Sequence, residues 1–345
     1  MASLQTASAY EQVGDRYRDN FSRDLLALAR YFQKNTMAAL QQQCGHEDLR
    51  LGFTAYITLI GARDMRLTEL ADTIGVSRQA CNQSIKQIEA AGYITSRPDP
   101  SDGRARQLQL SDRGRQLLTD GIRIATHVDE QFRDIIGGKA FRDTSDALRL
   151  LHADLLLAPG NAWQEPPLEY ALGGLLPRLS DYVFRELMRL TIDRGHPGLK
   201  LSFGQVLMFV GPNGGRIQHM AAIHDVSKQA ISAIAMELEE LGYLERRPDP
   251  EDARQIVLHL TAQGRQLIRD SVESLEAMEQ GFCDILGKRR FQRLTGNFRA
   301  LYARLPLERD LPLTADPQDL RLLAQKLRRQ LGPDGSRHLA GLLLD

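Results

Sequence analysis

The sequence predicts a mainly α-helical protein with small β-hairpins, built from two copies of one unit in a single chain. Of its 345 residues, 42% are hydrophobic, which is enough for two domains that each bury a core. Aromatic residues make up only 6%, whereas leucine, alanine, arginine and glutamine are abundant and favour helices. Residue n also matches residue n+150 without a gap through the middle of each half, which indicates a duplicated unit.

The repeat sets the domain boundaries. About two residues in five are identical between the segments that begin at Arg66 and Arg216, and the register extends upstream to His46 and His196. Between the copies, the segment APGNAWQEPPLEY over 158–170 contains prolines and a glycine, which break helices and suit a linker. We therefore predict four segments: a first repeat over 15–158, a linker over 159–167, a second repeat over 168–306 and a C-terminal extension over 307–345.

Long amphipathic segments flank the centre of each repeat. They carry apolar residues at helical spacing, and we expect them to form the helices through which the two repeats assemble. Their ranges are 17–43, 111–136, 139–157, 168–193, 261–286 and 288–305. A further segment over 316–332 begins with aspartate, has the same spacing and lacks a counterpart in the first repeat, so we expect one additional helix there.

The centre of the first repeat predicts two helices joined by a tight turn. Apolar residues keep helical spacing from Leu67 to Ile74, Gly75 interrupts the pattern, and Ser77 can cap a new helix. One face of this second helix is expected to be buried and consists of Ala80, Cys81, Ser84, Ile85 and Ile88. The opposite face carries groups that can hydrogen-bond base edges or phosphates, namely Arg78, Gln79, Asn82, Gln83 and Lys86.

A basic hairpin follows this helix. The helix is expected to end at Ala91-Gly92, and a strand over 93–95 leads into the turn-rich stretch RPDPSDGRAR before a returning strand with Leu108 and Leu110. The hairpin contributes three cations, Arg97, Arg104 and Arg106. A helical hairpin alone is common in domain cores. Its combination with a basic hairpin, repeated in the same order, predicts a winged helix-turn-helix that places a helix in the major groove and a wing near the minor groove.

The aspartates of the hairpin have structural interpretations. Asp99 and Asp249 are expected to lie in polar surface turns, and Asp102 and Asp252 to pair with Arg104 and Arg254 and so shape the hairpin.

These residues resemble the MarR family of bacterial regulators. The resemblance rests on Val-Ser-(Arg/Lys)-Gln-Ala, Leu/Ala-Gly-Tyr, Arg-Pro-Asp-Pro-x-Asp-x-Arg and Leu-(Ser/Thr)-x-x-Gly-Arg, which occur in this order in both repeats. It covers nearly all of residues 15–306. It implies a helical dimer that presents two winged motifs to successive major grooves of a near-palindromic operator. It also implies a repressor that is released by a small, often aromatic ligand or by oxidation.

The resemblance places candidate DNA-contacting residues in both repeats. In the first repeat the recognition helix would contain Ser77, Arg78, Gln79, Asn82 and Gln83, with Arg104 at the wing tip; Lys86, Arg97 and Arg106 extend this set. The candidates in the second repeat are Ser227, Lys228, Gln229, Ser232, Arg247 and Arg254. The usual family member is a single unit of about half this length. We therefore expect the chain to fold as its own pseudo-dimer, joined by interlocking dimerisation helices, with a homodimer as the open alternative.

The two repeats have diverged at the expected DNA surface. Asn82, Gln83 and Lys86 correspond to Ser232, Ala233 and Met236, so the second helix has lost an amide pair and a cation. Residues 66–106 contain six basic and five acidic side chains, against five and eight in residues 216–256. We therefore predict an asymmetric operator in which the first repeat supplies most of the specificity.

Other features limit the possible ligands. Tyr31, Phe32, Phe53 and Tyr56 are candidates for the wall of an effector pocket, although aromatic residues on amphipathic helices more often belong to the core. The three cysteines are far apart and suggest neither a disulfide framework nor a metal or cofactor site. Two roles are open for Cys44 and Cys81: sensing of oxidation, or a purely structural role.

Charge and hydropathy narrow the class of protein. Lysine plus arginine equals aspartate plus glutamate at 44 each, so any nucleic-acid surface must be local. The chain has neither an apolar run of membrane-spanning length nor a leader pattern at residue 1, so we expect a cytoplasmic protein. The main alternative to a regulator is a ligand-sensing or protein-interaction scaffold that has lost DNA binding. An enzyme is a weaker alternative, because no nucleophile and base occur at workable spacing.

Overall fold

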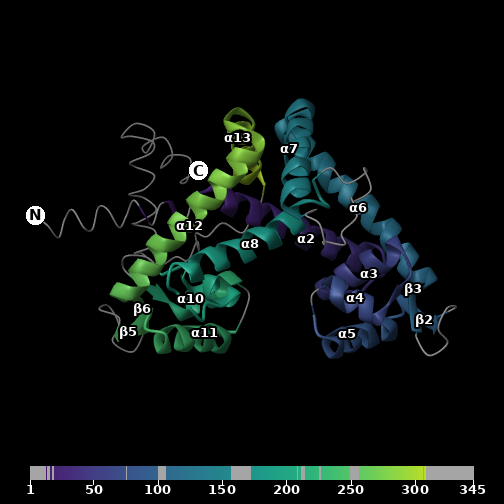
Figure 1. Ribbon diagram of the computed structural model, residues 1–345, viewed down its shortest axis with the longest axis horizontal. Helices are drawn as coiled ribbons and strands as arrows, with labels where there is room; N and C mark the ends of the chain where they lie inside the picture. Colours follow the sequence, from purple (N-terminus) through teal and green to yellow (C-terminus); the bar gives the residue numbers. More distant parts are fainter. Residues whose placement is uncertain are drawn as a thin grey trace, which may run out of the picture. The chain divides into compact units, whose positions relative to one another are not determined.

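The computed structural model describes residues 13, 16, 17, 19–74, 76–99, 106–156, 172–207, 209, 210, 214–224, 227–248, 256–305 and 307. It confirms a mainly helical chain with small antiparallel sheets (Figure 1). The described residues form two compact units. Unit 1 lies within Met1–Leu201 and Gln266–Leu307, and unit 2 within Ser202–Arg265. Among the described residues, no helix is both long and apolar enough to cross a membrane.

The first winged domain belongs to unit 1. After the 3-10 turn Leu51–Phe53 come the helices α3 (Thr54–Ala62), α4 (Leu67–Ile74) and α5 (Arg78–Ala90), and the strands β1 (Met65–Arg66), β2 (Ile94–Pro98) and β3 (Arg106–Leu110). The sheet has the order β1-β3-β2, and the hairpin register pairs Ile94 with Leu110 and Pro98 with Arg106. The predicted helix, tight turn, helix and hairpin are therefore confirmed in this order.

Local sequence signals explain where these elements begin and end. The Ser77 hydroxyl accepts a hydrogen bond from the backbone N–H of Ala80 at 3.2 Å, so the predicted cap of α5 is present. Helix α5 ends before Gly92, which adopts a left-handed φ of 78°. Gly114 allows a close approach, because a Cβ there would lie 2.0 Å from the carbonyl oxygen of Tyr93. Gly264 repeats this contact at Tyr243, which gives a physical reason for the glycine in the Leu-(Ser/Thr)-x-x-Gly-Arg motif.

Two details of the sequence interpretation were wrong. Asp99 was expected in an exposed turn, but its side chain is 7% exposed and its Oδ2 accepts a hydrogen bond from Arg66 Nε at 2.7 Å. This ion pair joins the residue after β2 to β1; its carboxylate is buried, whereas the Arg66 side chain is 42% exposed. Ala80 was expected on the buried face of α5 but is exposed, since it lies in the first turn, where the helix projects beyond the core.

Long helices complete unit 1. They are α2 (Phe21–Gln43), α6 (Asp112–Ile136), α7 (Gly138–Leu156), α8 (Leu176–Asp193), α12 (Ala262–Leu286) and α13 (Lys288–Arg304), and α12 begins in unit 2 and continues into unit 1. The sequence predicted all six ranges to within a few residues at their C-terminal ends. Two begin later than predicted: Asn20 caps α2 by accepting from Arg23 N at 2.8 Å, and Pro177 lies in the first turn of α8.

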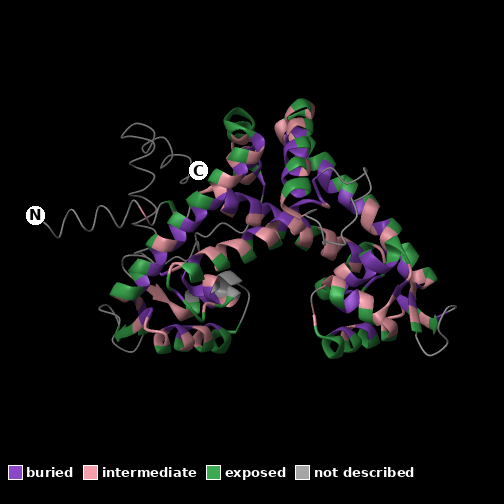
Figure 2. Ribbon diagram, in the orientation of Figure 1, coloured by how far each residue is buried: buried purple, intermediate pink, exposed green. Residues whose placement is uncertain are grey.

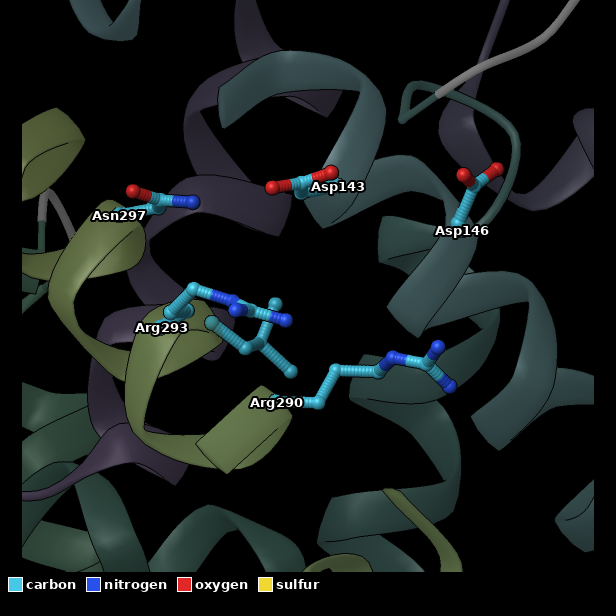
Figure 3. A pocket seen from close by; sticks show the side chains of 6 residues that line it. Asp143, Asp146, Arg290, Arg293 and Asn297 are labelled. Carbon is cyan, nitrogen blue, oxygen red and sulfur yellow. The ribbon is translucent and has the colours of Figure 1, made fainter. Parts of the chain in front are cut away.

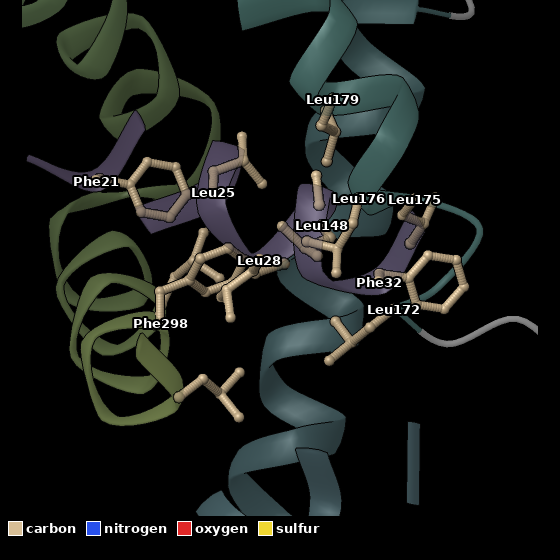
Figure 4. Packing of buried hydrophobic residues seen from close by; sticks show 14 of the residues in the cluster. Phe21, Leu25, Leu28, Phe32, Leu148, Leu172, Leu175, Leu176, Leu179 and Phe298 are labelled. Carbon is tan, nitrogen blue, oxygen red and sulfur yellow. The ribbon is translucent and has the colours of Figure 1, made fainter. Parts of the chain in front are cut away.

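One hydrophobic cluster joins the long helices of both repeats. Helix α2 packs against α6, α8 and α13, and α7 packs against α13. The cluster includes Leu28, Leu148 and Phe298, each fully buried (Figure 4). Phe132 and Val183 also belong to it and are fully buried. The helical core of unit 1 is thus made from residues that lie more than 250 positions apart in the chain.

Two carboxylates that accept backbone hydrogen bonds in unit 1 occupy equivalent positions in the repeat. The buried Asp129 carboxylate accepts from the backbone N–H groups of Leu172 at 3.2 Å and Gly173 at 3.1 Å. Glu279, its counterpart 150 residues later, accepts from the backbone N–H of Ser22 at 3.3 Å, and Ser22 is the counterpart of Leu172. Each contact therefore runs from one repeat to the other, and the second is the reciprocal of the first.

Unit 2 contains the second winged domain. Its helices are α9 (Gly204–Leu207), α10 (Ile217–His224) and α11 (Lys228–Glu240), and its strands are β4 (Gly215–Arg216), β5 (Leu244–Pro248) and β6 (Ile256–Leu260). The sheet order β4-β6-β5 and the register of Leu244 with Leu260 repeat those of the first winged domain. The predicted linker and the additional helix over 316–332 lie outside the described residues.

Candidate nucleic-acid interface

The outer face of α5 exposes a row of polar and cationic side chains. Cys81 and Ile88 are fully buried and Ile85 is 3% exposed, so they anchor the helix to the domain core. Buried and exposed positions alternate along α5 in the ribbon (Figure 2). The opposite face consists of exposed residues only, namely Ser77, Arg78, Gln79, Asn82, Gln83 and Lys86. All six predicted residues of this helix therefore lie on one solvent-facing surface. It combines two cations with three amide side chains that can both donate and accept hydrogen bonds.

Two arginines at the base of the first wing have different partners. Arg97 Nη2 donates to Asp64 Oδ2 at 2.6 Å and to Gln107 Oε1 at 3.3 Å, so a carboxylate neutralises its charge. Arg106 donates from Nε to the Ser96 hydroxyl at 2.7 Å and from Nη2 to the Ser96 carbonyl at 2.9 Å. These neutral acceptors orient the Arg106 guanidinium without cancelling its charge. Arg104 lies outside the described residues.

Arg66 is a residue at the base of this wing that the sequence pattern did not single out. Its ion pair with Asp99 connects β1 to the residue that follows β2. This ion pair holds the end of β2, where the wing begins, close to β1. The sequence does contain one signal for this ion pair. The arginine and the aspartate recur together, as Arg216 and Asp249, at the equivalent positions of the second repeat.

The second winged domain presents a different surface. The Ser227 hydroxyl caps α11 by accepting from Ala230 N at 3.1 Å, and Lys228 and Gln229 are exposed in the first turn. Ser232 is half-buried. Arg247 pairs with Glu245 at 2.5 Å, so this cation is neutralised by a residue of its own strand. Arg254 lies outside the described residues.

The four aromatic candidates for an effector pocket do not lie together. Phe32 belongs to the cluster of long helices and packs against Gly173, and Tyr31 lies 6.2 Å from Phe132, measured between ring centroids. Phe53 and Tyr56 are buried in the separate core of the first winged domain. The structure thus divides the predicted pocket wall between two hydrophobic clusters.

A polar groove lies elsewhere in unit 1, between α7 and α13. It is lined by Asp143, Asp146, Arg290, Arg293, Leu294 and Asn297 (Figure 3). Asn297 Nδ2 donates to Thr144 Oγ1 at 2.9 Å and so joins the two helices beside the groove. None of the aromatic candidates lines it.

The cysteines have contrasting environments. Cys81 is fully buried in α5, and this burial raises the pKa of its thiol. Cys44 is half-buried, and its sulfur accepts a hydrogen bond from Arg123 at 3.1 Å. Within the described part of the chain, no three histidine, cysteine, aspartate or glutamate side chains are grouped as metal ligands would be.

Parts of the chain are similar to known proteins. The sequence model of the MarR family matches residues 56–105 and 198–255, which cover most of each winged domain and end just before strands β3 and β6. These two segments of the chain are therefore similar to the MarR family. Among curated proteins, the HTH-type transcriptional regulator BilQ of Clostridioides difficile (strain CD3) is 27% identical over 107 residues, which are 30% of this chain and 72% of BilQ.

Several solved structures are also similar to part of this chain. CouR from Rhodococcus jostii RHA1, bound to p-coumaroyl-CoA, has 21% identity and a TM-score of 0.33, and the match covers 41% of this chain and 98% of CouR. The transcriptional regulator Tm0710 from Thermotoga maritima has 23% identity and a TM-score of 0.31, with coverage of 38% of this chain and 90% of that protein.

Proposed function

We propose that this chain is a transcriptional regulator that binds double-stranded DNA. The observation that carries the proposal is the outer face of α5, where two cations and three amides are exposed beside a wing whose base holds Arg106. Amide side chains can form bidentate hydrogen bonds with adenine, and cationic side chains can form hydrogen bonds with guanine or phosphate. The MarR family sequence in both winged domains supports the same function.

The proposed contacts divide into two kinds. Gln79, Asn82 and Gln83 would contact base edges in the major groove, with Ser77, Arg78 and Lys86 directed to bases or phosphates beside them. Arg97, Arg104 and Arg106 would contact the backbone or the minor groove from the wing. In the second winged domain, the corresponding contacts would come from Ser227, Lys228, Gln229, Ser232, Arg247 and Arg254.

We further propose that the two repeats, residues 15–158 and 168–306, pair within one chain as a pseudo-dimer. The reciprocal contacts of Asp129 with Leu172 and of Glu279 with Ser22 support this arrangement, because a two-fold interface repeats each contact with the partners exchanged. Pairing within one chain replaces a bimolecular step by an intramolecular one of high effective concentration. A chain that pairs with itself needs no second copy to present two winged domains.

The proposed operator is asymmetric, and the first winged domain supplies most of its specificity. The amide pair and the cation of α5 are replaced by Ser232, Ala233 and Met236, and Arg247 is already held by Glu245. Both differences weaken direct readout and phosphate attraction in the second domain.

Release of a repressor by a small aromatic effector remains a prediction from the family resemblance. Tyr31 and Phe32 pack in a different cluster from Phe53 and Tyr56, so one effector would meet only one of these pairs. Isothermal titration of the chain with a series of phenolic carboxylates tests this point, with Tyr31→Ala and Tyr56→Ala as the variants that separate the two clusters.

A second candidate function is a protein-interaction scaffold that does not bind specific DNA. The observation that favours it is the acidic second domain, with eight acidic and five basic side chains in residues 216–256 and with Met236 53% exposed. The cationic and amide-rich face of α5 favours the regulator instead, because a scaffold has no need to keep it.

Fluorescence anisotropy with the DNA upstream of the chain's own gene tests the proposal. The regulator predicts tight, salt-sensitive binding that prefers this DNA to a random duplex. It also predicts a larger loss from Arg104→Ala than from Arg254→Ala. Equally weak binding to the upstream DNA, to random duplexes and to a wider set of genomic fragments would support the scaffold.

A further inference from the structure

Two apolar side chains replace polar ones on the outer face of α11. In α5 this face carries Gln83 and Lys86, whereas the equivalent positions in α11 hold Ala233 and Met236. Both are solvent-exposed, and 53% of the surface of Met236 is accessible. The opposite face of α11 is anchored by Ile231, Ala235 and Leu238, which are fully buried. The orientation of α11 on its domain therefore matches that of α5, and only the chemistry of its outer face has changed.

The first turn of α11 has kept the features suited to DNA. Ser227 caps the helix, and Lys228 and Gln229 repeat the cation and the amide of Arg78 and Gln79. Positions 229, 233 and 236 follow the spacing of one helix face, and the three span about 10 Å along the axis at 1.5 Å per residue. This is about three base-pair steps of B-DNA. A helix docked through Lys228 and Gln229 would bring Ala233 and Met236 over the next base pairs.

The major groove offers one apolar group to such side chains. It is the 5-methyl group of thymine, which alanine and other apolar side chains contact in direct readout. Guanine, cytosine and adenine present only donors and acceptors there, which Ala233 and Met236 cannot satisfy. An apolar face at these positions therefore favours A·T pairs and disfavours a guanine.

We propose that Ala233 and Met236 contact thymine methyl groups in the half-site bound by the second winged domain. This inference rests on the proposed DNA-binding function and adds to it the base that the second domain selects. The first domain then uses amides and cations for readout, and the second uses methyl contacts.

Single exposed apolar residues are common and by themselves indicate nothing. Here the apolar pair stands at the two positions where the first domain has a polar pair, next to a first turn that kept its cation, amide and cap. The acidic residues Glu239 and Glu240 lie at the C-terminal end of α11, and Glu239 is paired with Arg246 at 2.6 Å. These two carboxylates lie about one turn beyond Met236, and the Arg246 guanidinium neutralises that of Glu239.

Replacing thymine by deoxyuridine tests the inference, because it removes the methyl group and keeps every base-pair hydrogen bond. The full chain is titrated by anisotropy against its operator duplex and against duplexes with one thymine replaced at a time. At one or more positions in one half-site, the affinity should fall about three- to five-fold, as expected for one buried methyl group. Met236→Ala should lower the affinity for the thymine duplex and reduce the effect of deoxyuridine at the position that Met236 contacts, whereas an effect at the position that Ala233 contacts is retained.

The matched control is Lys86→Ala, which changes the equivalent position of α5. It should lower the affinity of all duplexes by a similar factor and leave the deoxyuridine effect unchanged. Operator binding that is insensitive to every deoxyuridine, or a deoxyuridine effect that persists unchanged at every position in Met236→Ala, overturns this inference and leaves the proposed function intact. An absence of any preferred duplex for the native chain overturns the proposed function, and this inference with it.

Discussion

The carboxylate of Asp129 in α6 accepts a hydrogen bond from the backbone N–H of Leu172, which lies in the other repeat of the chain. This N···O distance is 3.2 Å. The carboxylate of Glu279 makes the reciprocal contact, accepting from the backbone N–H of Ser22 at 3.3 Å. Because both contacts cross between repeats, they tie the helices of the first repeat to those of the second. They are also the residues through which the proposed pseudo-dimer is most directly tested.

Replacing Asp129 by alanine is expected to destabilise unit 1. The change leaves the buried N–H groups of Leu172 and Gly173 without their acceptor, which costs about 1 to 3 kcal/mol. The measurement is the shift of the urea midpoint followed by circular dichroism. Asp134→Ala, an exposed site on the same helix, is the control and should shift the midpoint much less. Equal shifts would show that the Asp129 contact contributes nothing particular.

The stability of the chain should depend on pH through Asp24. Burial raises the pKa of Asp24 to about 6, although the nearby Arg299 guanidinium opposes the shift. Between the ordinary value of 3.8 and about 6, the folded chain keeps a proton that the unfolded chain loses. This group therefore favours folding below pH 4, and its contribution is lost as the pH rises through 6.

Asp24→Asn removes this titration and is expected to stabilise the chain at pH 7 by on the order of 1 to 3 kcal/mol. The advantage over the native chain should shrink as the pH falls from 7 to 4. Thermal unfolding at a series of pH values measures it, and the charges that face Asp24 are Asp19, Arg23, Glu279 and Arg299. A difference that is constant across the series would contradict the assignment to Asp24.

Asp64→Asn should strengthen DNA binding. In the free chain Asp64 holds Arg97 at 2.6 Å, and the change releases this guanidinium for a phosphate. One added phosphate contact should steepen the slope of log K against log salt by about 0.9. Asp64→Asn/Arg97→Ala separates this effect from net charge. If the double variant keeps the full gain, Arg97 is not the group that was released.

Cys81 should resist chemical modification in the folded chain. Its thiol is fully buried and burial raises its pKa, so little thiolate is present at neutral pH. Cys44 and Cys283 are half-buried and should react first with iodoacetamide. Mass spectrometry of peptides after timed alkylation gives the three rates. Labelling of Cys81 as fast as Cys44 without denaturant would revive oxidation sensing at this residue.

Much of the fold was predictable because it depends on local signals. The spacing of apolar residues predicted the long helices, Ser77 predicted the start of α5, and Gly92 predicted its end. The exposed face of α5 followed from the same spacing, since a helix with one apolar face must present the other to solvent. The repeat register then carried each assignment from the first winged domain to the second.

The contacts that cross long distances in sequence were not predictable. Asp99 lies between two prolines in a polar stretch, and only its approach to Arg66 explains why it is buried. Likewise, no pattern near Arg97 indicates that Asp64 neutralises it. The aromatic candidates failed to lie together for the same reason, because helix spacing places a residue on a face but does not say which core that face joins.

DNA footprinting of the region upstream of the chain's own gene tests the central claim most directly. The comparison is between the native chain and Asn82→Ser/Gln83→Ala/Lys86→Met, which gives α5 the outer face of α11. The account predicts a discrete protected site with two unequal half-sites for the native chain, and loss of protection over the stronger half-site for the variant. No discrete site, or the same footprint for both proteins, would contradict it.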